Sequence, residues 1–302
     1  MSNIRRLGVL VALSGVMLLA LMLLVFAYAE VGAVDEAWDE GLSLAAYDLS
    51  EVPVAVAEDA NRLAAELVGS GTHQDFVDQL LATYLEAQDK DVVVVFNSGG
   101  WGWNMVNTSP GWSSILEGIQ NELDDFGYDS LLLNYRRTSE SLWACAKELF
   151  EVTTSYPSKA KFLTGRVEFL VDHIPDLRVI VAGESNGSVI ADCVMYDLRE
   201  KPQVYSIQTG MPFWHRPMGV ERTLVLNNNG TGPDSFSEGD LPAMFNASAK
   251  HWFGFSGAEE REGEILDVLQ APGHDYSWAY PEVYSQITSF IVENFSIEEL
   301  YQ

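Results

Sequence analysis

The stretch "RVIVAGESNGSVIAD", residues 178–192, joins two different residue patterns at one sharp bend. Its first part, "RVIVAG", is rich in β-branched residues and apolar on both faces, which predicts a buried strand. Its last part has the apolar spacing of a helix. Between them, Ser185 has a glycine two residues before it and another two residues after it. Small residues at these positions let the chain turn back tightly and lift the serine hydroxyl above a sheet, as in a nucleophile elbow. The alternative is an ordinary turn in which Ser185 only caps the helix.

The chain around this bend alternates short apolar runs with helical stretches. Six runs predict strands, and they occupy residues 91–97, 129–135, 178–183, 203–208, 222–227 and 264–270. Intervening segments such as 111–127 and 160–174 have helical periodicity and the length that a crossover between parallel strands requires. The sequence therefore predicts an α/β domain over residues 91–302, with a mostly parallel sheet flanked by helices. Ser185 is expected at the carboxyl edge of that sheet, where reactive groups gather.

A serine nucleophile needs a base, and His274 has the best position among the five histidines. It lies in "QAPGHDYSW", after the last predicted strand and before a predicted helix at residues 281–295. Imidazole is suited to accepting the serine proton and returning it to the leaving group near neutral pH. The other histidines lie in helical or connecting segments, where a structural or exposed role is expected: His73, His173, His215 and His251.

The segment "VVVVFNSGGWGWN", residues 92–104, is the candidate for the oxyanion hole. Gly99 and Gly100 follow the first predicted strand, so their N–H groups are free of side-chain obstruction. The N–H of Asn186, directly after the nucleophile, would supply a further donor. The neighbouring apolar side chains would line a substrate pocket, with core packing as the alternative: Trp101, Trp103 and Met105.

The segments "GESNG", "NSGGWG" and "PGHDY" together resemble those of the α/β-hydrolase superfamily, over residues 91–302. The resemblance implies an α/β-hydrolase-like fold and a Ser-His-acid triad that attacks an ester, thioester or amide carbonyl through an acyl-enzyme. Two features depart from the family pattern. Asn97-Ser98 replaces the usual His-Gly of the oxyanion loop, and no strong strand candidate precedes Asp91. We therefore expect a reduced sheet of about six strands.

The resemblance places the triad acid after the predicted strand at residues 222–227. The segment "NNGTGPDSFSEGDLPAMF" then offers Asp234, Glu238 and Asp240. Asp240 directly precedes Leu-Pro and a helical run, where it would act as an N-cap. Asp234 also has a structural alternative, because Pro-Asp is common in turns. Asp234 is nearer the strand end, in a glycine-rich loop, so we favour it over Asp240 as the acid.

Charge and cysteine content exclude several classes of function. The chain has 44 acidic and 17 basic side chains, a formal net charge of -27, which would repel a phosphate backbone. We therefore expect no nucleic-acid partner. Cys145 and Cys193 are too few for a disulfide framework and lack metal-ligand spacing, so buried free thiols are expected. No metal or other cofactor is predicted.

The amino end carries a long apolar segment. Residues 7–29 contain no charged side chain and are long enough to cross a bilayer as a helix. Arg5 and Arg6 precede this segment, and acidic residues follow it. Residues 1–6 are therefore predicted as a cytoplasmic tail, and the chain after residue 29 is predicted to lie outside the cytoplasm. The alternative is a signal peptide cleaved near Ala29 and a secreted protein.

Residues 30–90 are acidic and mostly helical in pattern, with apolar residues repeating over residues 56–68 and 73–88. This region would form either a stalk between membrane and domain or a partial cover over the active site, and the sequence leaves both open.

These patterns predict an extracytoplasmic serine hydrolase that cleaves carboxylic esters, similar to esterases and lipases. Its partners would be a small-molecule ester or lipid-like substrate and, through residues 7–29, the membrane. Thioesterase and peptidase activities remain open. The alternative class is a non-catalytic, membrane-tethered binding or scaffold protein of the same fold.

Overall fold

The structure is a computed structural model, and it describes residues 37–38, 48–68, 73–102, 106–138, 148, 151–152, 154–253, 264–265 and 269–296. The predicted membrane span at residues 7–29 lies outside the described residues, and so do Trp103, Met105 and Cys145. Within the described ranges, no helix has both the length and the apolar character needed to cross a membrane.

The centre of the molecule is a six-stranded sheet with the strand order β1-β3-β2-β4-β5-β6. Five strands run parallel to one another, namely β2 (Val92–Asn97), β3 (Ser130–Arg136), β4 (Arg178–Glu184), β5 (Val204–Thr209) and β6 (Thr223–Leu226). These are five of the six predicted strands. The short edge strand β1 (Ala37–Trp38) is antiparallel to β3. A mostly parallel sheet in this order fits an α/β-hydrolase-like fold.

The prediction of a sixth strand over residues 264–270 is wrong. Glu264–Ile265 (β7) and Leu269–Gln270 (β8) form a separate antiparallel pair of two-residue strands. In the sequence, Glu264 and Asp267 interrupt the apolar residues of this segment, and such a pattern does not favour a strand that is buried on both faces. The sixth strand of the main sheet is instead β1, from the region predicted to be helical.

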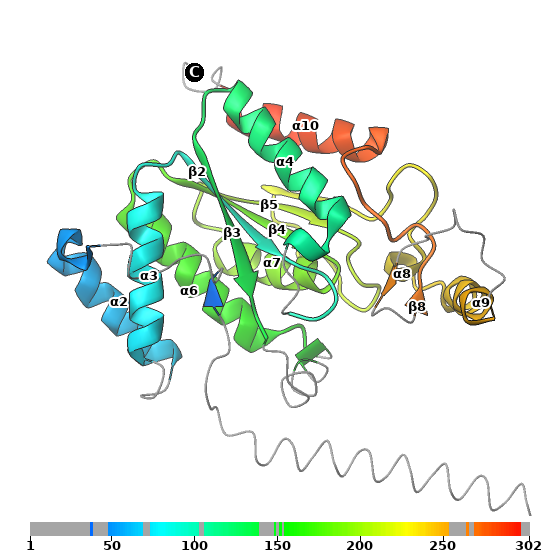
Figure 1. Ribbon diagram of the computed structural model, residues 1–302, viewed down its shortest axis with the longest axis horizontal. Coiled ribbons are helices and arrows are strands. Elements are labelled where there is room, and N and C mark those ends of the chain that lie inside the picture. Colours follow the sequence, from blue (N-terminus) through cyan, green and yellow to red (C-terminus); the bar gives the residue numbers. More distant parts are fainter. Residues whose placement is uncertain are drawn as a thin grey trace, which may run out of the picture.

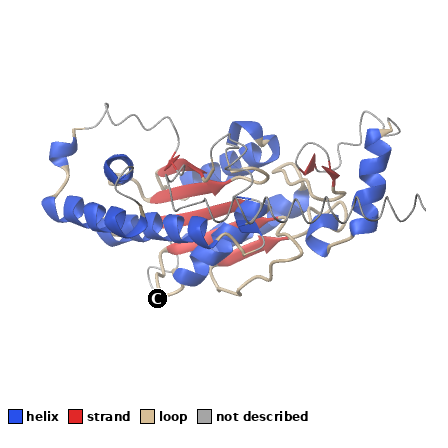
Figure 2. Ribbon diagram, turned by 90° about the horizontal axis from the view of Figure 1, so that it is seen from below, coloured by secondary structure: helices blue, strands red, loops and turns tan. Residues whose placement is uncertain are grey.

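Helices cover both faces of the sheet, as Figures 1 and 2 show. The helices α2 (Val54–Leu67), α3 (His73–Ala87), α6 (Pro157–His173) and α7 (Asn186–Asp197) contribute to the larger core cluster. The helices α4 (Pro110–Asp125) and α10 (Pro281–Phe295) contribute to the second cluster. Strand β2 shows why two clusters form: Val93 and Val95 enter the first, while Val94 and Phe96 enter the second.

Four short or peripheral helices complete the described part of the chain. They are η2 (Leu49–Glu51), η3 (Val106–Thr108), α8 (Ser235–Glu238) and α9 (Leu241–Trp252).

The helices α2 and α3 come from the region that the sequence left open between stalk and cover. They pack against α6, where Leu63 and Leu67 of α2 approach Gly165. Ala60, Ala64 and Leu80 are fully buried in this contact region. Figure 1 places α2 and α3 at the opposite side of the molecule from α8 and α9. These two helices are therefore part of the folded core.

Candidate active site

Ser185 lies on a strained turn between β4 and α7. Its backbone has φ 51° and ψ −116°, a region that residues with a side chain rarely adopt. The turn is held on both sides: the Ser185 N–H donates to the Thr209 carbonyl of β5 at 2.9 Å, and its carbonyl accepts from the Ser188 N–H at 2.9 Å. The Ser185 side chain makes no capping hydrogen bond to α7. The helix-cap alternative therefore does not account for this serine.

The two glycines beside Ser185 are required by close backbone contacts. A Cβ atom on Gly187 would lie 2.1 Å from the carbonyl oxygen of Asn97, the last residue of β2. A Cβ atom on Gly183 would lie 2.7 Å from the Gly187 carbonyl oxygen. The turn thus brings β4, α7 and the end of β2 so close together that only glycine, which has a hydrogen atom in place of a side chain, fits at these two positions.

We expect Gly187→Ala to lower the free energy of unfolding by about 1–3 kcal/mol, because the new methyl group must push backbone atoms apart. Gly232→Ala is the matched control, since a Cβ atom there has no heavy atom within 4 Å. Urea unfolding midpoints compare the two variants with the parent protein. Equal midpoints for Gly187→Ala and the parent would show that this close approach is not a constraint.

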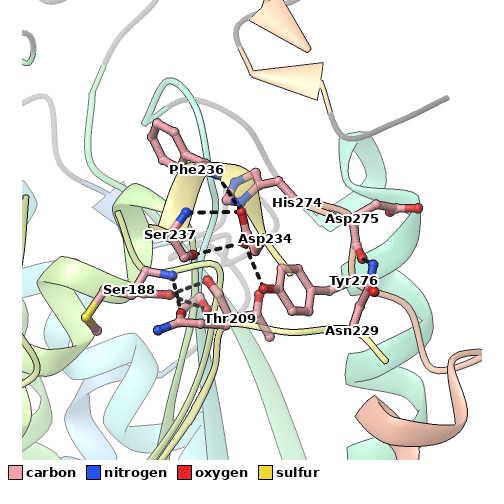
Figure 3. Close-up of polar contacts among 12 residues, drawn as sticks. Ser188, Thr209, Asn229, Asp234, Phe236, Ser237, His274, Asp275 and Tyr276 are labelled. Atoms are coloured by element: carbon pink, nitrogen blue, oxygen red, sulfur yellow. Dashed lines mark hydrogen bonds and ion pairs between the residues drawn. The ribbon is translucent and has the colours of Figure 1, made fainter. Parts of the chain in front are cut away.

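His274 and Asp234 form a buried pair at the carboxyl edge of the sheet. The His274 Nδ1 atom lies 2.8 Å from Asp234 Oδ2, and both side chains are almost fully buried. Asp234 caps α8, since its Oδ1 atom accepts from the N–H groups of Phe236 at 2.9 Å and Ser237 at 3.1 Å. Its Oδ2 atom also accepts from the Tyr276 hydroxyl at 2.8 Å and the Ser237 hydroxyl at 2.9 Å (Figure 3).

These contacts keep Asp234 ionised. Burial raises the pKa of Asp234. The hydrogen bond and charge of His274, together with the donors at Ser237 and Tyr276, lower the pKa by a larger amount, so it stays below its ordinary value. A carboxylate at this position can only accept, so the neutral imidazole carries its proton on Nδ1. The His274 Nε2 atom is then left with a lone pair that can accept a proton.

Gly210 places His274 beside the elbow. This glycine follows Thr209, whose carbonyl accepts the Ser185 N–H, and it has a left-handed φ of 61°. A Cβ atom on Gly210 would lie 2.5 Å from His274 Cε1, so the imidazole rests directly on this peptide. Ser185 and His274 are both described, and the structure records no hydrogen bond between their side chains. In free enzymes such contacts are often long and tighten when substrate binds.

The predicted oxyanion loop lies next to the elbow, but its donors are arranged differently from the expectation. The Gly99 N–H donates to Glu184 Oε2 at 3.0 Å. The Gly100 carbonyl accepts from the Arg137 guanidinium at 2.8 Å and from the Asn186 side-chain amide at 3.4 Å. Asn186 is the first residue of α7, so its N–H has no hydrogen-bond partner within the helix.

Glu184 is a further ionisable group, directly before Ser185 in the chain. Burial raises the pKa of Glu184, and the Gly99 N–H, the charge of His274 and the Ser109 hydroxyl offset part of that rise. Its position in "GESNG" is the only sequence signal that it lies in the site.

The remaining predicted residues have simpler positions. Asp240 caps α9, where its Oδ1 atom accepts from the Ala243 N–H at 3.0 Å, and it is exposed. Trp101 is half-buried in the loop after β2. Cys193 is a free, half-buried thiol in α7, where burial raises its pKa to about 11. Among the described residues, no group of three or more His, Cys, Asp or Glu side chains is arranged to hold a metal ion.

Comparisons with known proteins assign no function to this site. No protein-family model matches the chain, and no curated protein does. One solved structure that resembles it is Trichoderma reesei cutinase in complex with a C11Y4 phosphonate inhibitor. The two share 13% sequence identity with a TM-score of 0.40, over 82% of this chain and 94% of the cutinase chain. A likeness this loose carries no functional conclusion, which must come from the site itself.

Proposed function

We propose that the protein is a serine hydrolase that cleaves carboxylic esters through an acyl-enzyme. In this proposal Ser185 is the nucleophile, His274 the general base and Asp234 the acid that orients it. The observation that carries the proposal is the buried Asp234–His274 pair, 2.8 Å apart, beside a serine in a strained turn at the carboxyl edge of a parallel sheet.

The proposed reaction begins when His274 Nε2 takes the proton of the Ser185 hydroxyl. The serine oxygen forms a bond to the ester carbonyl carbon, and the carbonyl electrons move onto its oxygen. The Asn186 N–H faces this oxyanion as one donor, while the Asp234 carboxylate stabilises the imidazolium. The carbonyl re-forms, the bond to the alcohol oxygen breaks, and His274 returns the proton to the departing alcohol. Water then repeats the sequence on the acyl-enzyme and releases the acid.

Aromatic side chains near His274 favour a substrate with an apolar group. The Phe236 ring centroid lies 4.9 Å from that of His274, and the Trp214 ring lies 5.2 Å from Phe236. Phe213 packs against both of these aromatic residues and is 45% exposed, and Trp214 is 40% exposed. These three aromatic side chains form a continuous apolar surface that runs from the His274 imidazole to the solvent-exposed surface of the protein. Together with Trp101 it supports an ester with an apolar acyl or alcohol part.

A panel of p-nitrophenyl esters, from acetate to long-chain acyl groups, tests the reaction class, with the p-nitroanilide of one acyl group as the amide comparison. We expect release of p-nitrophenol, with kcat/KM rising as the acyl chain lengthens and little release from the anilide. Faster cleavage of the anilide than of the matching ester would instead make amide hydrolysis the main activity. No cleavage of any compound, with no labelling by a fluorophosphonate, would favour the non-catalytic binding protein.

We also propose that residues 7–29 anchor the protein in a membrane, with the hydrolase domain outside the cytoplasm. The uncharged run after Arg5 and Arg6 supports this topology. Protease added to intact cells, or to spheroplasts where an outer envelope is present, should degrade the domain while the mature chain keeps its own amino end. A soluble mature protein that begins at Glu30 would support the cleaved signal peptide instead.

A further inference from the structure

A buried arginine crosses the loop that follows β2. Arg137 comes directly after β3, and its side chain is fully buried. Its guanidinium donates to the Ser98 carbonyl at 2.7 Å, to the Gly100 carbonyl at 2.8 Å and to Glu148 Oε1 at 2.8 Å. One side chain thus holds two carbonyl groups of the loop, and one carboxylate balances its charge.

The contacts of Arg137 determine which way the loop amides face. None of the described peptide bonds is cis, so the C=O and N–H of one peptide point in opposite directions. The Ser98 carbonyl faces Arg137, so the Gly99 N–H of the same peptide faces away from it. That N–H donates to Glu184, the residue before Ser185. The Gly100 carbonyl also faces Arg137, so the Trp101 N–H is turned away from the guanidinium by the same geometry.

Glu148 and Gly102 close the loop around the arginine. The Gly102 N–H donates to Glu148 Oε2 at 3.1 Å, and the Arg137 N–H donates to the Gly102 carbonyl at 2.9 Å. A Cβ atom on Gly102 would lie 2.2 Å from Arg137 Cγ, so the chain passes directly over the arginine side chain. Arg137 and Glu148 therefore hold the loop at Ser98, Gly100 and Gly102.

Stability alone does not explain an ion pair at this place. A buried pair of charges adds little stability compared with apolar residues of the same size, because both charges lose their hydration. A hydrolase, however, gains from amide groups whose direction is fixed before the reaction starts, since they need not reorganise as the oxyanion forms. The Arg137–Glu148 pair lies against the loop where such groups are expected.

We propose that Arg137, paired with Glu148, is a positioning residue for the oxyanion loop and acts on the transition state through the direction of the peptides from Ser98 to Trp101. It touches the loop carbonyls and not the reacting atoms. The proposal rests on the proposed ester hydrolysis at Ser185.

Arg137→Lys tests this role, because lysine keeps the charge but cannot make the three separate contacts that the planar guanidinium makes. We expect kcat for a p-nitrophenyl ester to fall about 100-fold, as for a small misplacement of a catalytic group, with KM changed less than about threefold. Glu148→Gln, which keeps the side-chain shape, should lower kcat in the same direction. Fluorophosphonate labelling should slow in parallel with kcat in both variants.

Arg178→Lys is the matched control. Arg178 also joins separate elements, since it donates to the Tyr128 hydroxyl at 3.2 Å and to the Asn294 carbonyl at 3.4 Å. It is the first residue of β4, whereas Ser185 follows the last residue of the same strand, so the two lie at opposite ends of β4. This variant should lower the melting temperature while kcat stays within about twofold of the parent.

Two outcomes would overturn the proposal while ester hydrolysis by the parent protein stands. One is a folded Arg137→Lys or Glu148→Gln variant with the parent kcat. The other is an equal loss of kcat in Arg178→Lys, which would show that any loss of stability has this effect. Absence of hydrolysis in the parent protein itself would overturn both this proposal and the proposed function.

Discussion

Ser185→Ala should abolish ester hydrolysis, with kcat falling by about 10⁶-fold, the loss that follows removal of the nucleophile in a serine protease. The chemical reason is that alanine leaves no oxygen to form the acyl-enzyme, so Asp234 and His274 have no proton to move. The fold should survive, because the Ser185 side chain makes no capping hydrogen bond and the backbone contacts to Thr209 and Ser188 do not involve it. Steady-state kinetics and a thermal melt measure the two effects separately.

Ser155→Ala is the control for this prediction. The Ser155 hydroxyl lies 3.3 Å from His215 Nδ1, and His215 Nε2 lies 2.8 Å from Asp192 Oδ2, so the protein contains a second Ser-His-Asp series of contacts. Ser155 does not lie in a Gly-x-Ser-x-Gly turn, and Asp192 also accepts the Met218 N–H, as expected for a structural group. Activity should stay near that of the parent. Loss of activity in Ser155→Ala, with activity retained in Ser185→Ala, would move the nucleophile to Ser155.

Asp234→Asn should lower kcat by about 10⁴-fold, as the same exchange does in a serine protease triad. The asparagine can still accept the Phe236 and Ser237 N–H groups through its oxygen, so the cap of α8 is kept. Its amide nitrogen, however, would replace the oxygen that accepts from His274 and Tyr276. His274 must then accept at Nδ1 and carry its proton on Nε2, where it can no longer take the serine proton.

Asp240→Asn separates the two candidate acids. Asp240 caps α9 through the Ala243 N–H, and asparagine is an equally good cap, so this variant should keep the parent kcat and melting temperature. Near-normal turnover in Asp234→Asn with turnover lost in Asp240→Asn would assign the acid to Asp240 instead. Both aspartates cap helices, so the cap alone does not distinguish them, whereas the contact with His274 does.

The features that the sequence predicts well are local. Five strands follow from runs that are apolar on both faces, and the Gly-x-Ser-x-Gly bend follows from residues within five positions of one another. The structure also brings His274 to Asp234, a pairing that the sequence favoured only through the family resemblance. The predicted strand at residues 264–270 was wrong, because two acidic residues interrupt its short apolar pattern and β7 pairs with β8 instead.

The features that the sequence missed depend on residues far apart in the chain. Arg137 holds carbonyl groups of residues 98 and 100, and Glu184 accepts from the Gly99 N–H, yet no local spacing marks either contact. Such contacts arise where β2, β3 and β4 end at the same edge of the sheet, which is set by the order of the strands. The packing of α2 and α3 on α6 is another such feature, since an amphipathic pattern does not say which partner it faces.

The central claim is that Ser185 is a nucleophile activated by His274. The most direct test is to label the full-length protein with a fluorophosphonate, digest it and locate the adduct by peptide mass spectrometry. The account predicts one adduct, on the peptide that contains Ser185, with labelling strongly reduced in Asp234→Asn. An adduct on Ser155 or another residue, or no adduct on a folded protein, would contradict it.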